Sequence, residues 1–198
     1  MKKSVLAFSL ILALLLSLSV SAYAAKAPAK ADTEEVVELN WEEFEDALAE
    51  RKLKGDFYVL NAVTAQFWVP NTLKQIELTD DEVETGITAY FGDETEDHGF
   101  EGFGFYVTYY DGKGLTLEDY AEMIDEDEAY TGLETLKING LDAIGYYETD
   151  QERGIDFQYV TFVTDEGYIL TFAYWDVADE DYMELAVIMI SSIMPEEE

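Results

Sequence analysis

The sequence predicts an α+β fold, in which a mostly antiparallel β-sheet is covered by about three helices. Eight segments have the apolar–polar alternation or the β-branched and aromatic composition of strands, and three others repeat apolar residues at helical spacing. Few of the connections between the strand-like segments are long enough for a crossover. Helices packed on a sheet bury both kinds of apolar surface, so we expect a sandwich of helices on a sheet.

The first helix is expected to begin at Trp41. Asn40 is a suitable N-cap residue, and Glu43 follows three residues later, as in a capping box. Gly55 is a stop signal, so the helix is expected to end just before it.

Four strands are expected between this helix and the middle of the chain. The last of them alternates strongly, with Phe103, Phe105 and Val107 on one face. A turn-rich acidic stretch precedes it. The four strands are expected at residues 56–62, 65–69, 87–91 and 102–110.

The second half of the chain begins with a helix at Thr116, which has Asp119 at the capping-box position. Asn139-Gly140 between two β-like runs predicts a tight hairpin. Two further strands follow, and a last helix is expected at residues 179–193. Its middle is apolar nearly all round, which predicts deep burial against the sheet.

The N-terminus has the layout of a secretory signal peptide over residues 1–24. A short positive stretch precedes an apolar run over residues 5–20, and Ala22 and Ala24 supply the small-x-small cleavage pattern. The run falls short of the about 20 residues that a membrane-spanning helix needs. We expect cleavage before Ala25 and a secreted or periplasmic mature protein with no membrane span.

The remaining chain has the length of one ordinary domain and contains no internal repeat. Residues 25–36 are small and polar, and predict a flexible tether. We expect a single domain over residues 37–195, followed by an acidic tail over residues 196–198.

The chain is strongly acidic, with 44 Asp and Glu against 11 Lys and Arg and a net charge of −33. Affinity for nucleic acid comes largely from cations that replace counterions on phosphates, so nucleic acid is excluded as a partner. Anionic lipid is disfavoured for the same reason. The charge favours solubility, and a cationic partner or a divalent metal is the alternative use for it.

Few residues suited to catalysis are present. The chain has no cysteine, His98 is its one histidine, and Ser191 and Ser192 are the only serines beyond residue 24. A Ser-His-Asp triad needs its base within hydrogen-bond reach of the nucleophile, and zinc sites prefer His and Cys. We therefore expect a protein that is not an enzyme, although a hydrolase with paired carboxylates stays open because Asp and Glu are abundant.

Two acidic stretches are candidates for a weak, irregular calcium site. Asp93 and Asp97 begin and end a run with oxygen ligands at alternate positions, as at the start of an EF-hand loop, and Asp125 and Asp127 begin a second such run. Both lack the glycine and the final glutamate of an EF-hand. The alternative is a pair of solvated loops, and no other cofactor is expected.

Tyrosine is frequent in the expected strands, so some of these rings must face away from the core. An aromatic face of this kind can bind a glycan or a peptide, although tyrosine is also a good strand former in its own right. The candidates are Tyr106, Tyr110, Tyr146, Tyr147 and Tyr159.

Several segments of the chain together resemble the PsbP-like family. They include an Ile-Asn-Gly hairpin, a Tyr-Ile-Leu-Thr-Phe strand and a closing helix that ends on Ser-Ser-Ile. The segments are residues 67–70, 116–124, 138–143, 146–147, 159–163, 167–172 and 190–193. The resemblance implies an α/β/α sandwich that acts as a binding or assembly module, and it supplies no ligand residues.

The most favoured function is thus a secreted, non-enzymatic binding or protein-interaction module. Its partner would be a protein or a glycan, with a cationic partner among the options. An extracellular calcium-binding protein and a carboxylate-dependent hydrolase are the alternatives.

Overall fold

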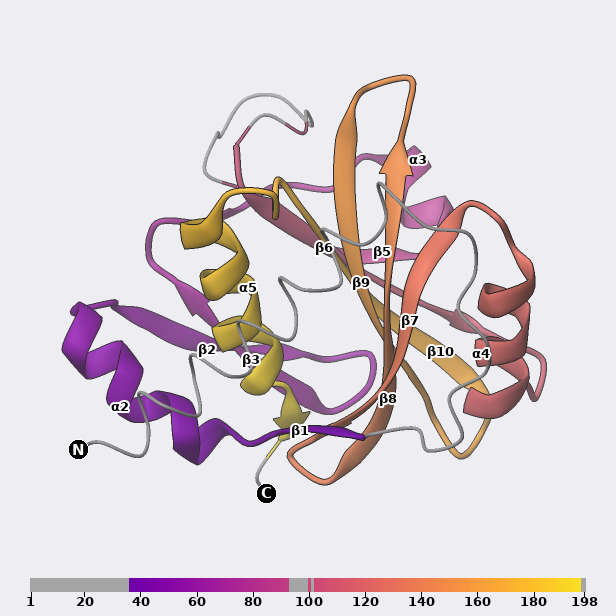
Figure 1. Ribbon diagram of the computed structural model, residues 1–198, viewed down its shortest axis with the longest axis horizontal. Helices are drawn as coiled ribbons and strands as arrows, with labels where there is room; N and C mark the ends of the chain where they lie inside the picture. Colours follow the sequence, from indigo (N-terminus) through magenta and orange to yellow (C-terminus); the bar gives the residue numbers. More distant parts are fainter. Residues whose placement is uncertain (1–35, 93–99, 101, 197–198) are drawn as a thin grey trace.

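The computed structural model describes residues 36–92, 100 and 102–196, and its main element is an eight-stranded sheet (Figure 1). The order of the strands is β1-β7-β8-β9-β10-β6-β5-β4, and every neighbouring pair is antiparallel except β1 and β7. The strands are β1 (Val37–Leu39), β4 (Lys74–Gln75), β5 (Ile87–Gly92), β6 (Gly104–Asp111), β7 (Tyr130–Ile138), β8 (Leu141–Asp150), β9 (Ile155–Val163) and β10 (Tyr168–Trp175).

A second, three-stranded sheet and four helices complete the described part of the fold. The small sheet has the order β11-β3-β2 and is antiparallel. These elements are β2 (Gly55–Leu60), β3 (Ala65–Pro70), β11 (Met194–Pro195), α2 (Trp41–Arg51), α3 (Asp80–Glu84), α4 (Leu117–Glu126) and α5 (Glu180–Ser191). The expected α+β class is confirmed.

The two faces of the large sheet are covered differently. In Figure 1, α2, α5 and the small sheet lie on one side of the large sheet and α4 lies on the other. The first side holds the main core, in which Phe67 of β3 packs against Phe105 and Phe172 of the large sheet. We call this side the core face and the other side the outer face.

The covering of the core face differs from the expected layer of helices. The strands predicted at residues 56–62 and 65–69 do exist, but they pair with each other and with β11 in a separate sheet. Helix α5 lies alongside this sheet and is buried from Ala186 to Ser191, as its apolar composition predicts. Within the described residues, no helix is long and apolar enough to cross a membrane.

The ends of the first helix also differ from the prediction. The side chain of Asn40 makes no capping hydrogen bond, and the helix ends at Lys52, which adopts a left-handed conformation with φ 57°. Gly55 is already the first residue of β2. The backbone N–H of Trp41 instead donates to the side-chain oxygen of Asn139 at 2.8 Å.

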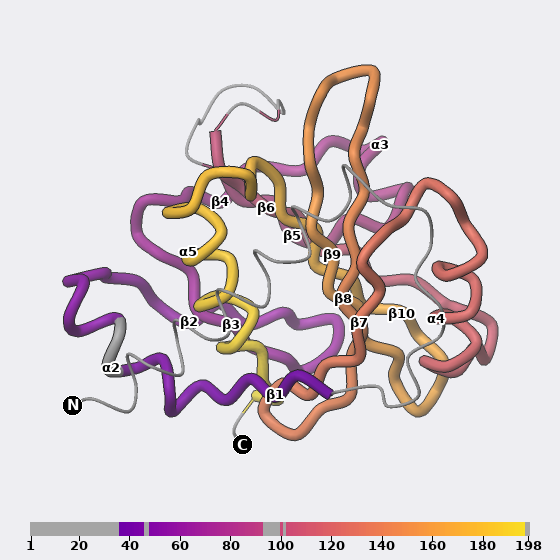
Figure 2. Tube along the Cα trace, viewed as in Figure 1, coloured from indigo at the N-terminus to yellow at the C-terminus, as the bar shows by residue number. Residues whose placement is uncertain are grey.

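Asn139 joins three elements that are far apart in the sequence. It forms the predicted Asn-Gly turn of the β7–β8 hairpin, with φ 48° at Asn139 and 84° at Gly140. Its amide nitrogen donates to the carbonyls of Ser191 and Ile193 at 2.7 and 2.8 Å. Figure 2 shows the tip of this hairpin beside β1 and the C-terminal end of α5.

Candidate functional site

Six tyrosines gather on the outer face of the large sheet, next to α4. They come from β6, β7, β8, β9 and α4, and they surround a region that α4 covers only in part. We call them the tyrosine cluster: Tyr106, Tyr110, Tyr120, Tyr130, Tyr146 and Tyr159.

The rings of the tyrosine cluster contact one another directly. Tyr146 and Tyr159 are stacked, with centroids 5.0 Å apart. Tyr130 directs its ring edge-on to both, at 5.2 and 6.2 Å. This mixture of stacked and edge-to-face contacts is favourable for aromatic rings and fixes their orientation.

A chain of hydroxyl groups runs beneath these rings. The phenols of Tyr120 and Tyr146 lie 3.3 Å apart, and the Tyr146 phenol lies 3.2 Å from the hydroxyl of Thr161. The hydroxyls of Thr161 and Thr171 are 2.8 Å apart. The strand alternation that directs Tyr146 and Thr161 to the outer face thus places four hydroxyls in one hydrogen-bonded row.

One carboxylate lies at the cluster. The phenol of Tyr159 donates to Glu148 at 2.7 Å. Burial is the main cause that raises the pKa of the Tyr120 and Tyr159 phenols. The tyrosines therefore stay neutral at physiological pH, while the ring faces and Glu148 give the site a negative potential.

The cluster is accessible to solvent at one end. Tyr110 has 42% of its surface exposed, and Tyr106, Tyr120, Tyr130 and Tyr159 are half-buried. Tyr146 is buried beneath them. The cluster therefore offers ring faces and phenol groups to a partner at the surface.

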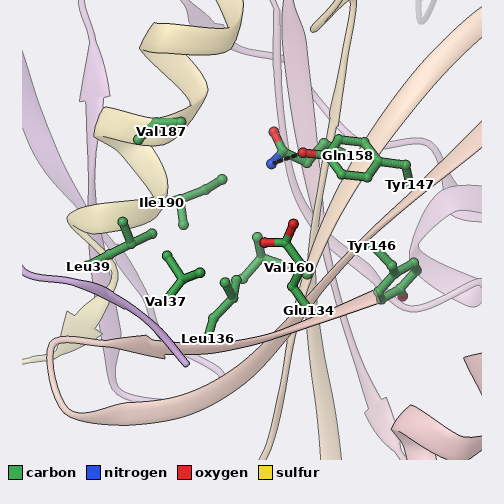
Figure 3. A pocket seen from close by; sticks show the side chains of 11 residues that line it. Val37, Leu39, Glu134, Leu136, Tyr146, Tyr147, Gln158, Val160, Val187 and Ile190 are labelled. Atoms are coloured by element: carbon green, nitrogen blue, oxygen red, sulfur yellow. Dashed lines mark hydrogen bonds between the residues drawn. The ribbon is translucent and has the colours of Figure 1, made fainter. Parts of the chain in front are cut away.

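A small pocket lies on the core face, between β1, β7 and α5 (Figure 3). The volume of the pocket that water can reach is about 20 Å³, which is room for one or two waters. Its walls are mostly aliphatic, but Figure 3 shows the Glu134 carboxylate pointing toward Gln158 and Tyr147.

Glu134 is at an unfavourable place for a charge. It follows the same strand alternation as the buried Leu136 and Ile138, which directs its side chain to the core face. Burial alone raises its pKa from the ordinary 4.5 to about 7. One of its oxygens is buried and accepts no hydrogen bond from the described residues.

This pKa predicts a specific pH dependence of stability. Because Glu134 binds its proton more tightly in the folded state, the free energy of unfolding falls as the pH rises from about 4.5 to about 7. Replacing Glu134 with glutamine should remove about 1–2 kcal/mol of this fall, after allowance for solvent screening. Urea unfolding of both proteins across this pH range measures the difference. Parallel pH profiles would contradict the prediction.

The predicted calcium candidates are not brought together with the tyrosine cluster. Asp93 and Asp97 lie outside the described residues. Asp125 belongs to the last turn of α4 and not to a loop, while Asp127 caps this helix and accepts from the N–H of Ala129 at 3.0 Å. No group of three or more acidic, His or Cys side chains suited to a metal occurs in the described part of the chain. A calcium site at these four residues stays a prediction.

The alternation of side chains along each strand places the predicted aromatic residues on different faces of the large sheet. Tyr106, Tyr110, Tyr146 and Tyr159 belong to the tyrosine cluster, whereas Tyr147 lines the pocket on the core face. Sequence reasoning missed Tyr120, Tyr130, Glu134 and Glu148 as site residues. The alternation of positions along each strand was the signal that could have placed Glu134 on the core face and Glu148 on the outer face.

The structure is similar to solved structures, one of which is a PsbP protein. It resembles the solution structure of cyanobacterial PsbP (CyanoP) from Synechocystis sp. PCC 6803, with a TM-score of 0.49 and 12% sequence identity. The match covers 71% of this chain and 92% of that chain. At this identity the likeness concerns the fold alone, and neither a family model nor a curated protein matches the sequence.

Proposed function

We propose that this protein is a secreted, non-enzymatic binding module that holds a cationic segment of a partner protein against the tyrosine cluster. The observation that carries the proposal is the set of contacting tyrosine rings with Glu148 hydrogen-bonded among them. Ring faces and a carboxylate attract Lys and Arg side chains through cation–π and charge interactions.

The charge of the whole chain supports a cationic partner. A net charge of −33 attracts cations and repels polyanions at long range, which raises the association rate of a basic segment. The export signal expected at residues 1–24 would bring the module into contact with extracellular proteins.

The same groups are poorly suited to catalysis. A general base or nucleophile needs a pKa near or below the working pH, whereas burial raises the pKa of Tyr106, Tyr146 and Tyr159 further above it. Phenols that keep their protons act as hydrogen-bonding and ring surfaces. This favours binding over the carboxylate-dependent hydrolase.

Calorimetric titration with a short Lys- and Arg-containing peptide tests the proposal. We expect saturable binding that weakens as salt increases. Replacing Tyr110 with alanine should weaken it about fivefold, because one cation–π contact at a partly exposed site is worth about 1 kcal/mol.

Tyr168 offers a matched control. It is exposed to a similar extent, 37%, and stacks on Tyr109 at 5.2 Å, but it lies at the core-face side of β10. Tyr168→Ala should leave the affinity unchanged. Equal losses in both variants, or equal affinity for a Glu-containing peptide of the same length, would contradict a cationic site at the tyrosine cluster. Binding of a neutral oligosaccharide that is sensitive to Tyr110→Ala alone would assign the cluster to a glycan.

A further inference from the structure

The pocket beside Glu134 is built separately from the tyrosine cluster, on the opposite face of the sheet. Three oxygen-bearing groups form its polar wall. Glu134 and Gln158 each have a buried oxygen that accepts no hydrogen bond from the described residues. The third group is the phenol of Tyr147, which accepts from the amide nitrogen of Gln158 at 3.2 Å.

The buried oxygens of Glu134 and Gln158 lack a donor. Gln158 is only 5% exposed, so its free oxygen is removed from bulk water. Leaving a buried acceptor unpaired costs about 1–3 kcal/mol, and more for a charged one. The amide nitrogen that could serve Glu134 is already directed to Tyr147. The pocket therefore calls for an occupant that donates hydrogen bonds and carries positive charge.

The other walls limit the kind of cation. They are aliphatic and come from four elements: Val37 and Leu39 of β1, Leu136 of β7, Val160 of β9, and Val187 and Ile190 of α5. Calcium takes six to eight oxygen ligands, and magnesium keeps several waters in an octahedral shell. Three oxygen-bearing groups in an aliphatic pocket do not provide either arrangement. An anion is excluded because the polar wall carries a carboxylate and no basic side chain.

We infer that this pocket binds a primary ammonium group, with its three N–H bonds directed to Glu134, Gln158 and Tyr147 and its alkyl chain against the aliphatic wall. An ammonium group has three donors and no acceptor, which matches three acceptors. The group belongs either to a free small amine or to the side chain of a lysine. The available volume has room for one or two waters and so fits the –NH₃⁺ head and at most one carbon.

The electrostatics of the pocket agree with this occupant. Glu134, Tyr146 and Tyr147 are the titratable residues at its wall, and the described residues of β1 and α5 there have none. The ring of Tyr146 is directed to the tyrosine cluster on the outer face. Burial raises the pKa of the Tyr147 phenol, with a further contribution from Glu134, so the phenol stays protonated. A bound cation would offset the burial that raises the pKa of Glu134 to about 7.

The test is a titration of the full chain with methylammonium chloride, followed by NMR. Two readouts report on the site: the side-chain amide of Gln158 and the ¹³C carboxyl resonance of Glu134. We expect saturable shifts of both and a lower pKa of Glu134 with amine present. Tetramethylammonium chloride at the same ionic strength is the matched ligand control, because it has the charge without an N–H donor.

Two variants separate the site from general charge effects. Glu134→Gln keeps the shape and removes the charge, and should weaken methylammonium binding at least tenfold. Glu148→Gln removes one charge from the outer face and should leave it unchanged. The amide spectra of both variants show whether the fold is intact, and Tyr147→Phe, which keeps the ring, gives a second test of the same pocket.

Each outcome decides the matter. If methylammonium saturates the pocket and a lysine-containing peptide does not, the pocket binds free amines. If both saturate it, the pocket also binds the lysine side chain of a partner protein. Equal responses to methylammonium and tetramethylammonium would overturn the inference. No saturable response would show that water, or a Gln158 amide turned to donate to Glu134, satisfies these groups. Loss of peptide binding at the tyrosine cluster with this pocket intact would overturn only the proposed function.

Discussion

Replacing Phe67 with alanine is expected to lower the free energy of unfolding by about 3–5 kcal/mol, the range for a buried phenylalanine. Phe67 is 0% exposed, and its ring contacts three phenylalanines of the large sheet, whereas Tyr58 of the small sheet contacts one of them, Phe91. Its neighbours within ring contact are Tyr58, Phe91, Phe105 and Phe172, at 5.2–6.3 Å. Removing it leaves a cavity between two sheets that cannot easily close.

Phe57 supplies the matched control for this variant. It lies on β2 of the same small sheet but is 41% exposed, with Trp41 as its aromatic neighbour at 5.5 Å. Phe57→Ala should cost about 1 kcal/mol, the value of one aromatic pair. Urea unfolding followed by tryptophan fluorescence measures both. Similar losses in the two variants would mean that the small sheet does not depend on Phe67 for its attachment.

The small sheet also shows where sequence reasoning about the fold ends. Alternation identified β2 and β3, since it reports which residues of a strand face inward. It does not report which strands pair, because β2, β3 and the strands of the large sheet have the same local signals. The pairing of β3 with β11 depends on residues 65–66 and 194–195, which are neighbours in the structure but far apart in the sequence.

The elements that the prediction missed are short. Strand β1 has three residues and pairs in parallel with β7, so it contains no turn signal and little alternation. Helix α3 has five residues and none of them is buried, which leaves no helical periodicity to detect. Its capping box, formed by Thr79 and Glu82, was the one visible sign of it. These elements were missed because they are too short to show the periodicity of a strand or a helix.

The candidate sites were predictable to different degrees. Tyrosine-rich strands were visible, and parity along β8 separates Tyr146 and Glu148 from Tyr147. Glu134 also has a sequence signal, because it precedes Leu136 and Ile138 at spacing two and so must face inward with them. The gathering of Tyr120 with the strand tyrosines was not visible, since it depends on the position of α4 over the sheet.

Asn139 is the second position at which a single change should have a large effect. Asn139→Ala is expected to lower the free energy of unfolding by about 2–4 kcal/mol, because it removes three hydrogen bonds and leaves partly buried backbone groups unpaired. The three partners are the N–H of Trp41 and the carbonyls of Ser191 and Ile193. Alanine also tolerates the left-handed φ of 48° less well than asparagine does.

Glycine at the same position separates the two causes. Asn139→Gly accepts the left-handed backbone at little cost but has no side chain, so it loses the three hydrogen bonds alone. We expect most of the alanine variant's loss in the free energy of unfolding, measured with urea, and faster hydrogen exchange at the backbone amide of Trp41. If Asn139→Gly instead has the same free energy of unfolding as the wild type, Asn139 contributes only its backbone conformation in the turn, and its side-chain hydrogen bonds add no stability.

Asn139→Asp carries the distinction further. Aspartate keeps an oxygen for the N–H of Trp41, but it offers no donor and directs a negative charge at the carbonyls of Ser191 and Ile193. It should therefore destabilise the protein at least as much as glycine does, and recover part of the loss at low pH, where the carboxyl group can donate. The Asn-Gly pair predicted a hairpin from two neighbouring residues. The stability of the fold depends on partners of Asn139 that lie 98, 52 and 54 residues away, a coupling that only the folded chain creates.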